Sequence, residues 1–327
     1  MSASLRVLLG SIVDYAGLFP PARLPLDQAV RNYLRYRSEP ESWMLGRFVL
    51  PAARLDELSQ FGEEISSTDR PFAVSALGRG GNTADEFRAG LGADLCDIAR
   101  ALERPGPRLT VNVLEVRLPP DASSRPNTLG GMLDGAAYVI DYTALPHLTV
   151  YYETALGPGW GEVVAAVARH NPIGAPRRAA TYRGAGLKLR CGGLEAAAFP
   201  APEQVAFVLH ACLAAGVPLK FTAGLHHPLR HFDPGVQAHM HGFLNVFGAG
   251  TLGHAHGLNE DELRAILTDE DAGHFACDAA GLRWRDLRAT PEQVAAARRE
   301  AVVSFGSCSF DEPRDDLRAL GWLGDDA

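Results

Sequence analysis

The chain has 327 residues, 46% of them hydrophobic and 21% charged, a composition typical of a globular protein rather than a disordered one. Its formal net charge of −8 argues against a general binder of nucleic acid or of anionic membranes. Five scattered cysteines form no C-x-x-C pair, which favours reduced thiols and a cytoplasmic location. No apolar run approaches the length of a membrane-spanning helix, so we expect no membrane partner.

Along the chain, residues 1–45 are predicted to be an N-terminal extension that packs on the main domain. It contains Asp14 in a turn-rich segment and a helix at residues 26–37. From residue 46 onward strands and helices alternate. The expected strands are residues 46–51, 72–77, 109–118, 148–154, 186–191, 219–223, 274–277 and 302–306. The helices expected between and after them include residues 55–65, 160–170, 202–215 and 315–323.

This alternation over residues 46–327 predicts βαβ units and a parallel sheet. Eight such units fit an α/β fold of the (β/α)8 TIM-barrel type. A doubly wound open sheet is the alternative, but it would normally carry a Gly-rich phosphate turn after its first strand. The first predicted strand is followed instead by Pro51-Ala-Ala-Arg54. The sequence therefore favours the barrel as one domain of residues 46–327.

Polar side chains gather at the carboxyl ends of the predicted strands, where the active sites of such barrels form. They alternate with apolar side chains, which predicts that they share one face of each strand. The predicted catalytic residues are Lys220, Lys188, Glu153 and His226. The predicted substrate-binding residues are Arg190, Thr222, Tyr151, Glu115, Ser304 and Cys308.

The two lysines are the main argument for catalysis. Lys188 and Lys220 lie on neighbouring predicted strands, with Arg190 close to Lys188. Nearby cations and burial both lower the pKa of a lysine, and a neutral lysine can attack a carbonyl to form a Schiff base. A second, charged lysine could bind an anionic group of the substrate. The alternative is that both lysines pair with Glu115 and Glu153 and only brace the barrel.

The segment Lys220-Phe-Thr-Ala-Gly224 resembles the strand-six lysine motif of class I aldolases of the deoxyribose-phosphate type. The resemblance covers about five residues and implies a (β/α)8 barrel with Lys220 as the Schiff-base lysine. The second lysine of that family lies on the following strand, whereas Lys188 lies on the preceding one. The histidine pair after Gly224 is also outside the family pattern. The chain as a whole resembles an uncharacterised family of bacterial proteins, which implies no activity.

The histidines support a second hypothesis, because many of them fall between His226 and His256. Imidazoles are common metal ligands, and Glu153 or Glu115 could complete a site for a divalent metal such as zinc. His226 and His227 are the predicted ligands. His226 could instead act without metal as a general acid or base.

Together these observations predict an enzyme, a lyase of the aldolase type or an isomerase, that acts on a small anionic carbonyl compound without a cofactor. The first alternative is a metal-dependent hydrolase or isomerase that uses His226, His227 and a carboxylate. The second is a barrel that binds a metabolite without catalysis. A homo-oligomer is compatible with the sequence.

Overall fold

The computed structural model describes residues 2–67, 70–104, 106, 108–122, 126–143, 145, 147–157, 159–171 and 182–324. Within them, no helix is both long and apolar enough to cross a lipid bilayer. The chain divides into two compact units, which we describe in turn. The first contains Met1–Gly46 and Leu189–Ala327, and the second contains Arg47–Lys188.

Eight parallel strands form a closed barrel, which confirms the predicted (β/α)8 class. In chain order they are β1 (Val13–Tyr15), β2 (Leu45–Pro51), β3 (Phe72–Leu77), β4 (Leu109–Arg117), β5 (Leu148–Glu153), β6 (Tyr182–Arg190), β7 (Leu219–Thr222) and β13 (Val302–Ser307). The order around the barrel is β1-β13-β7-β6-β5-β4-β3-β2.

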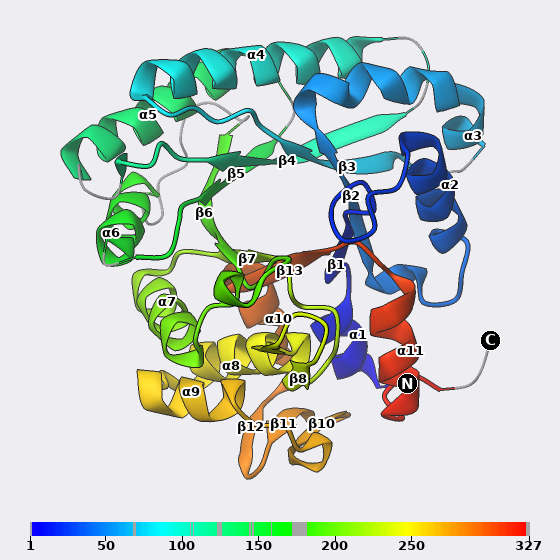
Figure 1. The fold of residues 1–327 in the computed structure, drawn as a ribbon, viewed down its shortest axis with the longest axis vertical. Helices are drawn as coiled ribbons and strands as arrows, with labels where there is room; N and C mark the ends of the chain where they lie inside the picture. The colour runs from blue at the N-terminus through cyan, green and yellow to red at the C-terminus, as the bar shows by residue number, and fades with distance from the viewer. Residues whose placement is uncertain are drawn as a thin grey trace. The chain divides into compact units, whose positions relative to one another are not determined.

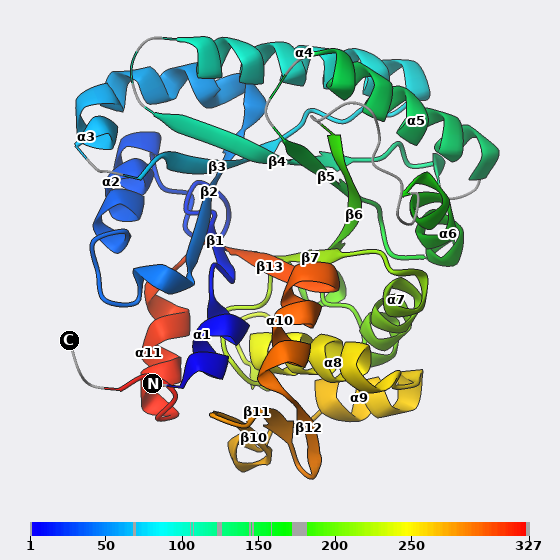
Figure 2. The ribbon, with the colours of Figure 1, turned by 180° about the vertical axis from the view of Figure 1, so that it is seen from behind.

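In the second unit, the helices lie along one side of the strands (Figures 1 and 2). They are the 3-10 helix η2 (Ala52–Phe61), α3 (Gly62–Ser66), α4 (Ala84–Glu103), α5 (Pro126–Tyr142) and α6 (Trp160–His170). Thr83 caps α4 by accepting a hydrogen bond from the Glu86 amide. Phe87 of α4 packs on Tyr152 of β5, so the neighbouring positions Tyr151 and Glu153 face away from the helices.

In the first unit, α10 (Pro291–Glu300) and α8 (Phe243–His256) pack on β13 (Figure 1). The other helices of this unit are α1 (Ala3–Leu9), α2 (Leu26–Tyr36), η1 (Ser42–Met44), η4 (Ala196–Ala198), α7 (Pro202–Ala215), α9 (Glu260–Leu267), η5 (Ala272–His274) and α11 (Asp311–Ala319). Phe221 of β7 and Phe305 of β13 both pack on Phe247 of α8. Lys220 and Ser304, next to these phenylalanines in the chain, therefore face the opposite side of the strands.

Two small antiparallel sheets also belong to the first unit. β8 (His231–Asp233) pairs with β9 (Ala238–Met240) as a hairpin. β10 (Phe275–Asp278), β11 (Gly281–Trp284) and β12 (Leu287–Ala289) form a three-stranded sheet.

The N-terminal segment is not the extension that we predicted. β1 pairs in parallel with β13, with Val13 opposite Phe305 and Asp14 opposite Gly306. It is the first barrel strand, so the barrel does not begin at residue 46. The hydrophobic pattern of the sequence did not predict this strand, because the strand is only three residues long and has the fully buried Asp14 at its centre.

The predicted strand at residues 274–277 is correspondingly wrong as a barrel strand. β10 pairs with β11 in the antiparallel direction, with Phe275 opposite Trp284. Asp278 accepts a hydrogen bond of 2.8 Å from the Ala280 amide, and Gly281 has φ +118°. This turn folds the chain back at once, so the segment forms a hairpin instead of a βα unit.

Two predicted helices also differ from those observed. Most of the predicted helix at residues 55–65 is the 3-10 helix η2. The predicted helix at residues 315–323 begins earlier, at Asp311, with Pro313 in its first turn. Ser309 accepts a hydrogen bond of 3.2 Å from the Glu312 amide, which helps to begin α11 at that point.

Candidate functional site

The first unit contains a buried group of three polar side chains, one from each of three adjacent strands. Lys220 of β7 contacts the Asp14 carboxylate of β1 and donates a hydrogen bond of 3.1 Å to Ser304 Oγ of β13. Ser304 in turn donates a hydrogen bond of 2.7 Å to Asp14 Oδ2. All three residues are at most 1% exposed. We call Lys220, Asp14 and Ser304 the lysine–aspartate group.

The strand register brings these side chains together. Phe221 lies opposite Phe305, so Lys220 and Ser304, one position earlier on each strand, are neighbours on the face that turns away from α8. Asp14 lies opposite Gly306 on the other edge of β13. A buried ammonium is stable only with a charged and hydrogen-bonded partner, and Asp14 supplies one.

Gly46 leaves the space that the Asp14 carboxylate occupies. A Cβ atom at Gly46 would collide with Asp14 Oδ1 and would lie 3.2 Å from the carbonyl oxygens of Ser11 and Val13. The Gly46 carbonyl accepts a hydrogen bond of 2.8 Å from Tyr33 of α2. The position of Asp14 therefore depends on the absence of a side chain at residue 46.

The second unit contains another buried polar group, formed by four consecutive strands. Lys188 Nζ of β6 lies 2.8 Å from Glu115 Oε2 of β4 and 2.8 Å from Glu153 Oε2 of β5. Ser75 of β3 donates a hydrogen bond of 2.6 Å to Glu115 Oε1. Tyr151, which is buried and faces the same side as Glu153, lies opposite Glu115 in the register. We call Lys188, Glu115, Glu153 and Ser75 the lysine–glutamate group.

Lys188 is held in its charged form. Burial lowers its pKa, but the charges of Glu115 and Glu153 and their hydrogen bonds outweigh burial, so the pKa lies above the ordinary lysine value. We expected cationic neighbours to lower the pKa of this lysine, and that expectation is wrong for Lys188. Its pairing with both glutamates is the arrangement that the bracing alternative predicted.

The two predicted metal ligands, His226 and His227, pair with different carboxylates, although the His227 ring packs on the His231 ring with centroids 4.5 Å apart. His226 Nδ1 lies 3.1 Å from Glu312 Oε2, and His227 Nδ1 lies 2.5 Å from Asp316 Oδ2. Both carboxylates belong to α11. Among the residues that the structure describes, no three histidine, cysteine, aspartate or glutamate side chains form a group able to hold a metal ion. The metal hypothesis stays a prediction without a ligand set in this part of the chain.

The remaining predicted binding residues lie in the first unit, near the carboxyl ends of its strands. Arg190 is exposed at the end of β6, and the Cys191 amide after it donates a hydrogen bond of 2.8 Å to the carbonyl of Thr222 on β7. Thr222 is half-buried opposite Gly306. Cys308 is also half-buried, and burial raises the pKa of its thiol, so it is not activated as a thiolate.

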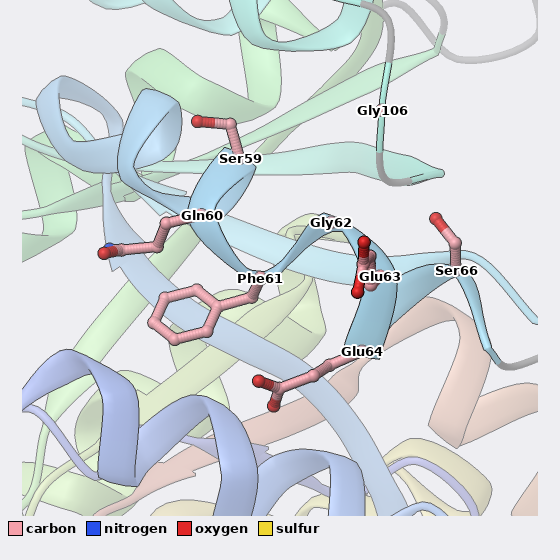
Figure 3. A pocket seen from close by; sticks show the side chains of 8 residues that line it. All are labelled: Ser59, Gln60, Phe61, Gly62, Glu63, Glu64, Ser66 and Gly106. Atoms are coloured by element: carbon pink, nitrogen blue, oxygen red, sulfur yellow. The ribbon is translucent and has the colours of Figure 1, made fainter.

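The second unit also contains a pocket of about 570 Å³. It lies on the side of the strands that faces the helices, opposite the lysine–glutamate group. Gln60, Glu63 and Glu64 line it from η2 and α3, and their side chains do not converge on one point (Figure 3). Gly106, shortly before β4, also lines it. Since α3 and Gly106 lead into the amino-terminal ends of β3 and β4, this pocket is not at the end of a barrel where catalysis occurs.

Two members of these groups were missed by the sequence interpretation. The sequence pattern indicates no role for Asp14 and does not single out Ser75, because each meets its partner only through the fold. A compositional signal was also available. Lys188 and Lys220 are the only lysines among the 31 basic residues of the chain. Arginine cannot lose its proton in proteins or act as an amine nucleophile, so two buried lysines in an arginine-rich chain are distinctive.

The strand that carries Lys220 is not the sixth strand of the barrel. With β1 included, Lys188 lies on the sixth barrel strand and Lys220 on the seventh. Lys220 thus does not hold the strand position that the resemblance implied. No protein-family model matches this chain, and no curated protein is similar enough in sequence to count as a relative. The fold and the two polar groups define the chain as a (β/α)8-barrel protein, a class that is commonly enzymatic.

Proposed function

We propose that this chain is an enzyme that acts on a small anionic carbonyl compound, as a carbon–carbon lyase or an isomerase, with Lys220 as the reacting amine. The observation that carries the proposal is the direct contact of the Lys220 ammonium with the Asp14 carboxylate, both fully buried. A lysine reacts with a carbonyl only as the free amine, and Asp14 is placed to take its proton.

The chemistry follows from that contact. Lys220 gives one proton to Asp14, and its free amine attacks the carbonyl carbon of the substrate. Asp14 returns the proton to the carbonyl oxygen, which gives a carbinolamine whose nitrogen still carries a positive charge. That nitrogen then gives a second proton to Asp14, which passes it to the hydroxyl. The oxygen leaves as water while the nitrogen lone pair forms the C=N bond of the iminium ion.

The iminium then accepts the electron pair of an adjacent bond, which forms an enamine. If a carbon–hydrogen bond breaks, its proton goes to the base His226. If a carbon–carbon bond breaks, the hydroxyl on the far carbon gives its proton to that base and the fragment leaves as a carbonyl compound. Protonation of the enamine and addition of water release the product and restore Lys220.

The surroundings of the two lysines favour Lys220 over Lys188 for this role. Lys188 contacts two carboxylates, and its raised pKa keeps it charged. Lys220 shares Asp14 with the Ser304 hydroxyl, which also donates to Asp14 Oδ2. A hydroxyl at this position can move a proton between the amine and the carboxylate. Lys188 would act through its charge, while Lys220 would act through its nitrogen lone pair.

The carboxyl ends of the neighbouring strands offer the other groups that the reaction needs. Thr222 follows Lys220 on the same face of β7 and is half-buried, so the substrate would approach Lys220 past it. The exposed Arg190 next to this point would bind the anionic group of the substrate. His226, oriented by Glu312 at 3.1 Å, would transfer a proton to or from the carbon atoms.

Borohydride trapping tests the proposal. The full-length protein is incubated with a panel of keto acids and sugar phosphates and reduced, and the adduct is located by peptide mass spectrometry. Because the chain holds only two lysines, an adduct can form only at Lys188, at Lys220 or at the N-terminal amine. We expect the adduct at Lys220, and we expect Lys220→Met and Asp14→Asn to abolish it.

The variants Lys188→Met and Arg88→Met serve as comparisons, since Arg88 is an exposed basic residue of α4. Arg88→Met should trap as much substrate as the natural sequence. An adduct that persists in Lys220→Met and lies on Lys188 would transfer the nucleophile role to Lys188. Turnover of a substrate without any adduct would overturn the Schiff-base chemistry.

A further inference from the structure

A second pocket lies in the first unit, and none of the residues of the lysine–aspartate group lines it. It has a volume of about 340 Å³ and is bounded by the segment between β7 and β8, by the loop after α9 and by α11. Arg230 and Glu270 bring charges to it, and Leu229 and Leu320 bring apolar surface. His227 and Asp316 close one side through their hydrogen bond of 2.5 Å.

Arg230 is the feature of this pocket that suggests a ligand. Its side chain is only 14% exposed. In the part of the chain that the structure describes, its guanidinium forms an ion pair with Glu270 at 3.6 Å and has no closer partner. That distance is too long for a hydrogen bond, so the planar set of N–H donors remains available to a ligand.

A hydrogen bond to a buried side chain fixes the backbone at Arg230. Its backbone amide donates a hydrogen bond of 2.8 Å to the side chain of Asn245, which is fully buried in α8. Asn245 also donates to the carbonyls of Ile266 and Asp269, at 2.8 and 2.7 Å. This network holds the segment that carries Arg230 against the end of α9. A ligand would therefore meet an arginine that is already in place.

Glu270 is the weaker partner of the pair. Its side chain is 52% exposed, and it also faces His239 at 3.8 Å, another distance beyond a hydrogen bond. Such an exposed carboxylate can turn into solvent at little cost, whereas the Arg230 side chain is only 14% exposed. An oxyanion that binds Arg230 through two parallel hydrogen bonds would displace Glu270.

We propose that this pocket binds a small organic oxyanion, a carboxylate or a phosphate ester, with its charged group on Arg230 and its apolar part on Leu229 and Leu320. The pocket is a second binding site of the protein and is independent of the chemistry at Lys220. It gives a role to Asn245, which the lysine mechanism does not use.

Isothermal titration calorimetry on the full-length protein tests this site with butyrate, n-butyl phosphate and inorganic phosphate. We expect butyrate or butyl phosphate to bind, and the tighter of the two identifies the oxyanion. n-Butylammonium, with the same apolar part and the opposite charge, should not bind. Arg230→Gln should weaken binding by about tenfold or more, because it removes charge-assisted hydrogen bonds. Glu270→Gln should strengthen binding by up to about fivefold, because a competing exposed ion pair is lost.

Arg264→Gln is the matched control, since Arg264 is a basic residue of α9 with exposed carboxylate partners, and it should bind the probes normally. If Arg230→Gln fails to fold, Leu320→Glu provides a second test, because a carboxylate on the apolar wall should weaken both anionic probes. Equal losses in Arg230→Gln and Arg264→Gln, or equal binding of n-butylammonium, would overturn the proposal, as would no binding of either organic anion.

Discussion

The Lys188 ammonium has a defined structural role whatever its part in catalysis. It lies 2.8 Å from each of two carboxylates and is nearly buried with them. Replacing it with methionine would leave Glu115 and Glu153 without that cation. Removal of one partner from a buried ion pair costs about 3–5 kcal/mol, so Lys188→Met should lower the free energy of unfolding by that amount. Urea denaturation at neutral pH measures it.

The control for this substitution is Arg88→Met, which removes one positive charge from an exposed pair with Asp85. It should change the free energy of unfolding by no more than about 1 kcal/mol. If Lys188→Met were as stable as this control, the lysine–glutamate group would not brace the sheet, and its role would be in function alone.

Gly46 is the residue that sets the position of Asp14, and alanine there is a precise test of the lysine–aspartate group. The new Cβ atom would collide with Asp14 Oδ1 and approach two backbone carbonyls, so the carboxylate must move. We expect Gly46→Ala to lower the melting temperature and to reduce trapping at Lys220. Gly92→Ala, within α4 with nothing near its Cβ position, should instead stabilise by about 0.5–1 kcal/mol. Full trapping in Gly46→Ala would show that Asp14 need not hold its position for Lys220 to react.

Between elements, α11 is attached to the N-terminal part of the first unit by a network of charges. Arg314 of α11 contacts Glu39 and Asp311 and lies 3.4 Å from Glu41, while Arg318 lies 2.8 Å from Glu41. Burial would raise the pKa of Glu41 and of Asp311, but the hydrogen bonds and charges of their partners outweigh it and lower both values. Tyr36 of α2 also donates a hydrogen bond of 2.7 Å to Asp311.

The sign of the pH dependence follows from these lowered pKa values. A carboxyl group with a lowered pKa in the folded state stabilises the fold above its unfolded pKa, near 4, and loses that contribution as the pH falls through the folded value. Arg314→Met should therefore destabilise most at neutral pH, by about 3 kcal/mol, and much less near pH 3. Urea denaturation at both pH values checks this, with Arg31→Met on the exposed face of α2 as the control. A loss of the same size at both pH values would contradict the assigned role of the carboxylates.

At the scale of elements, alternation in the sequence predicted most of the barrel strands because their inner and outer faces differ in polarity. Lys220 between Leu219 and Phe221 is an example: Phe221 packs on Phe247 of α8, and Lys220 faces Asp14 and Ser304 on the opposite side, as the alternation predicted. Pairing was not predictable where the strand was short or the partner distant. Asp14 and Lys220 are 206 residues apart, so no local pattern connects them. The segment at residues 275–278 has a strand pattern, but its turn rather than its composition decides its partner.

For the molecule as a whole, the main consequence is that the barrel closes through the N-terminal segment. β1 pairs with β13 and supplies Asp14, and α1 before it packs on α10. A chain that begins at residue 46, the domain boundary predicted from sequence, would lack one of eight strands and the partner of a buried lysine. We expect this truncated chain to be insoluble or to unfold without a cooperative transition, because an open barrel exposes strand edges and an unpaired charge.

Two point substitutions in α1 separate the loss of packing from the loss of chain length. Leu8 is 1% exposed and its neighbour Val7 is 37% exposed. Leu8→Ala should lower the free energy of unfolding by about 2–5 kcal/mol, since it leaves a cavity, whereas Val7→Ala should cost less than about 1 kcal/mol. A soluble chain of residues 46–327 with a cooperative thermal transition and unchanged trapping at Lys220 would instead restore the N-terminal segment as a dispensable extension. That outcome would require Lys220 to keep its reactivity without Asp14, and so would also remove the carboxylate from the proposed reaction.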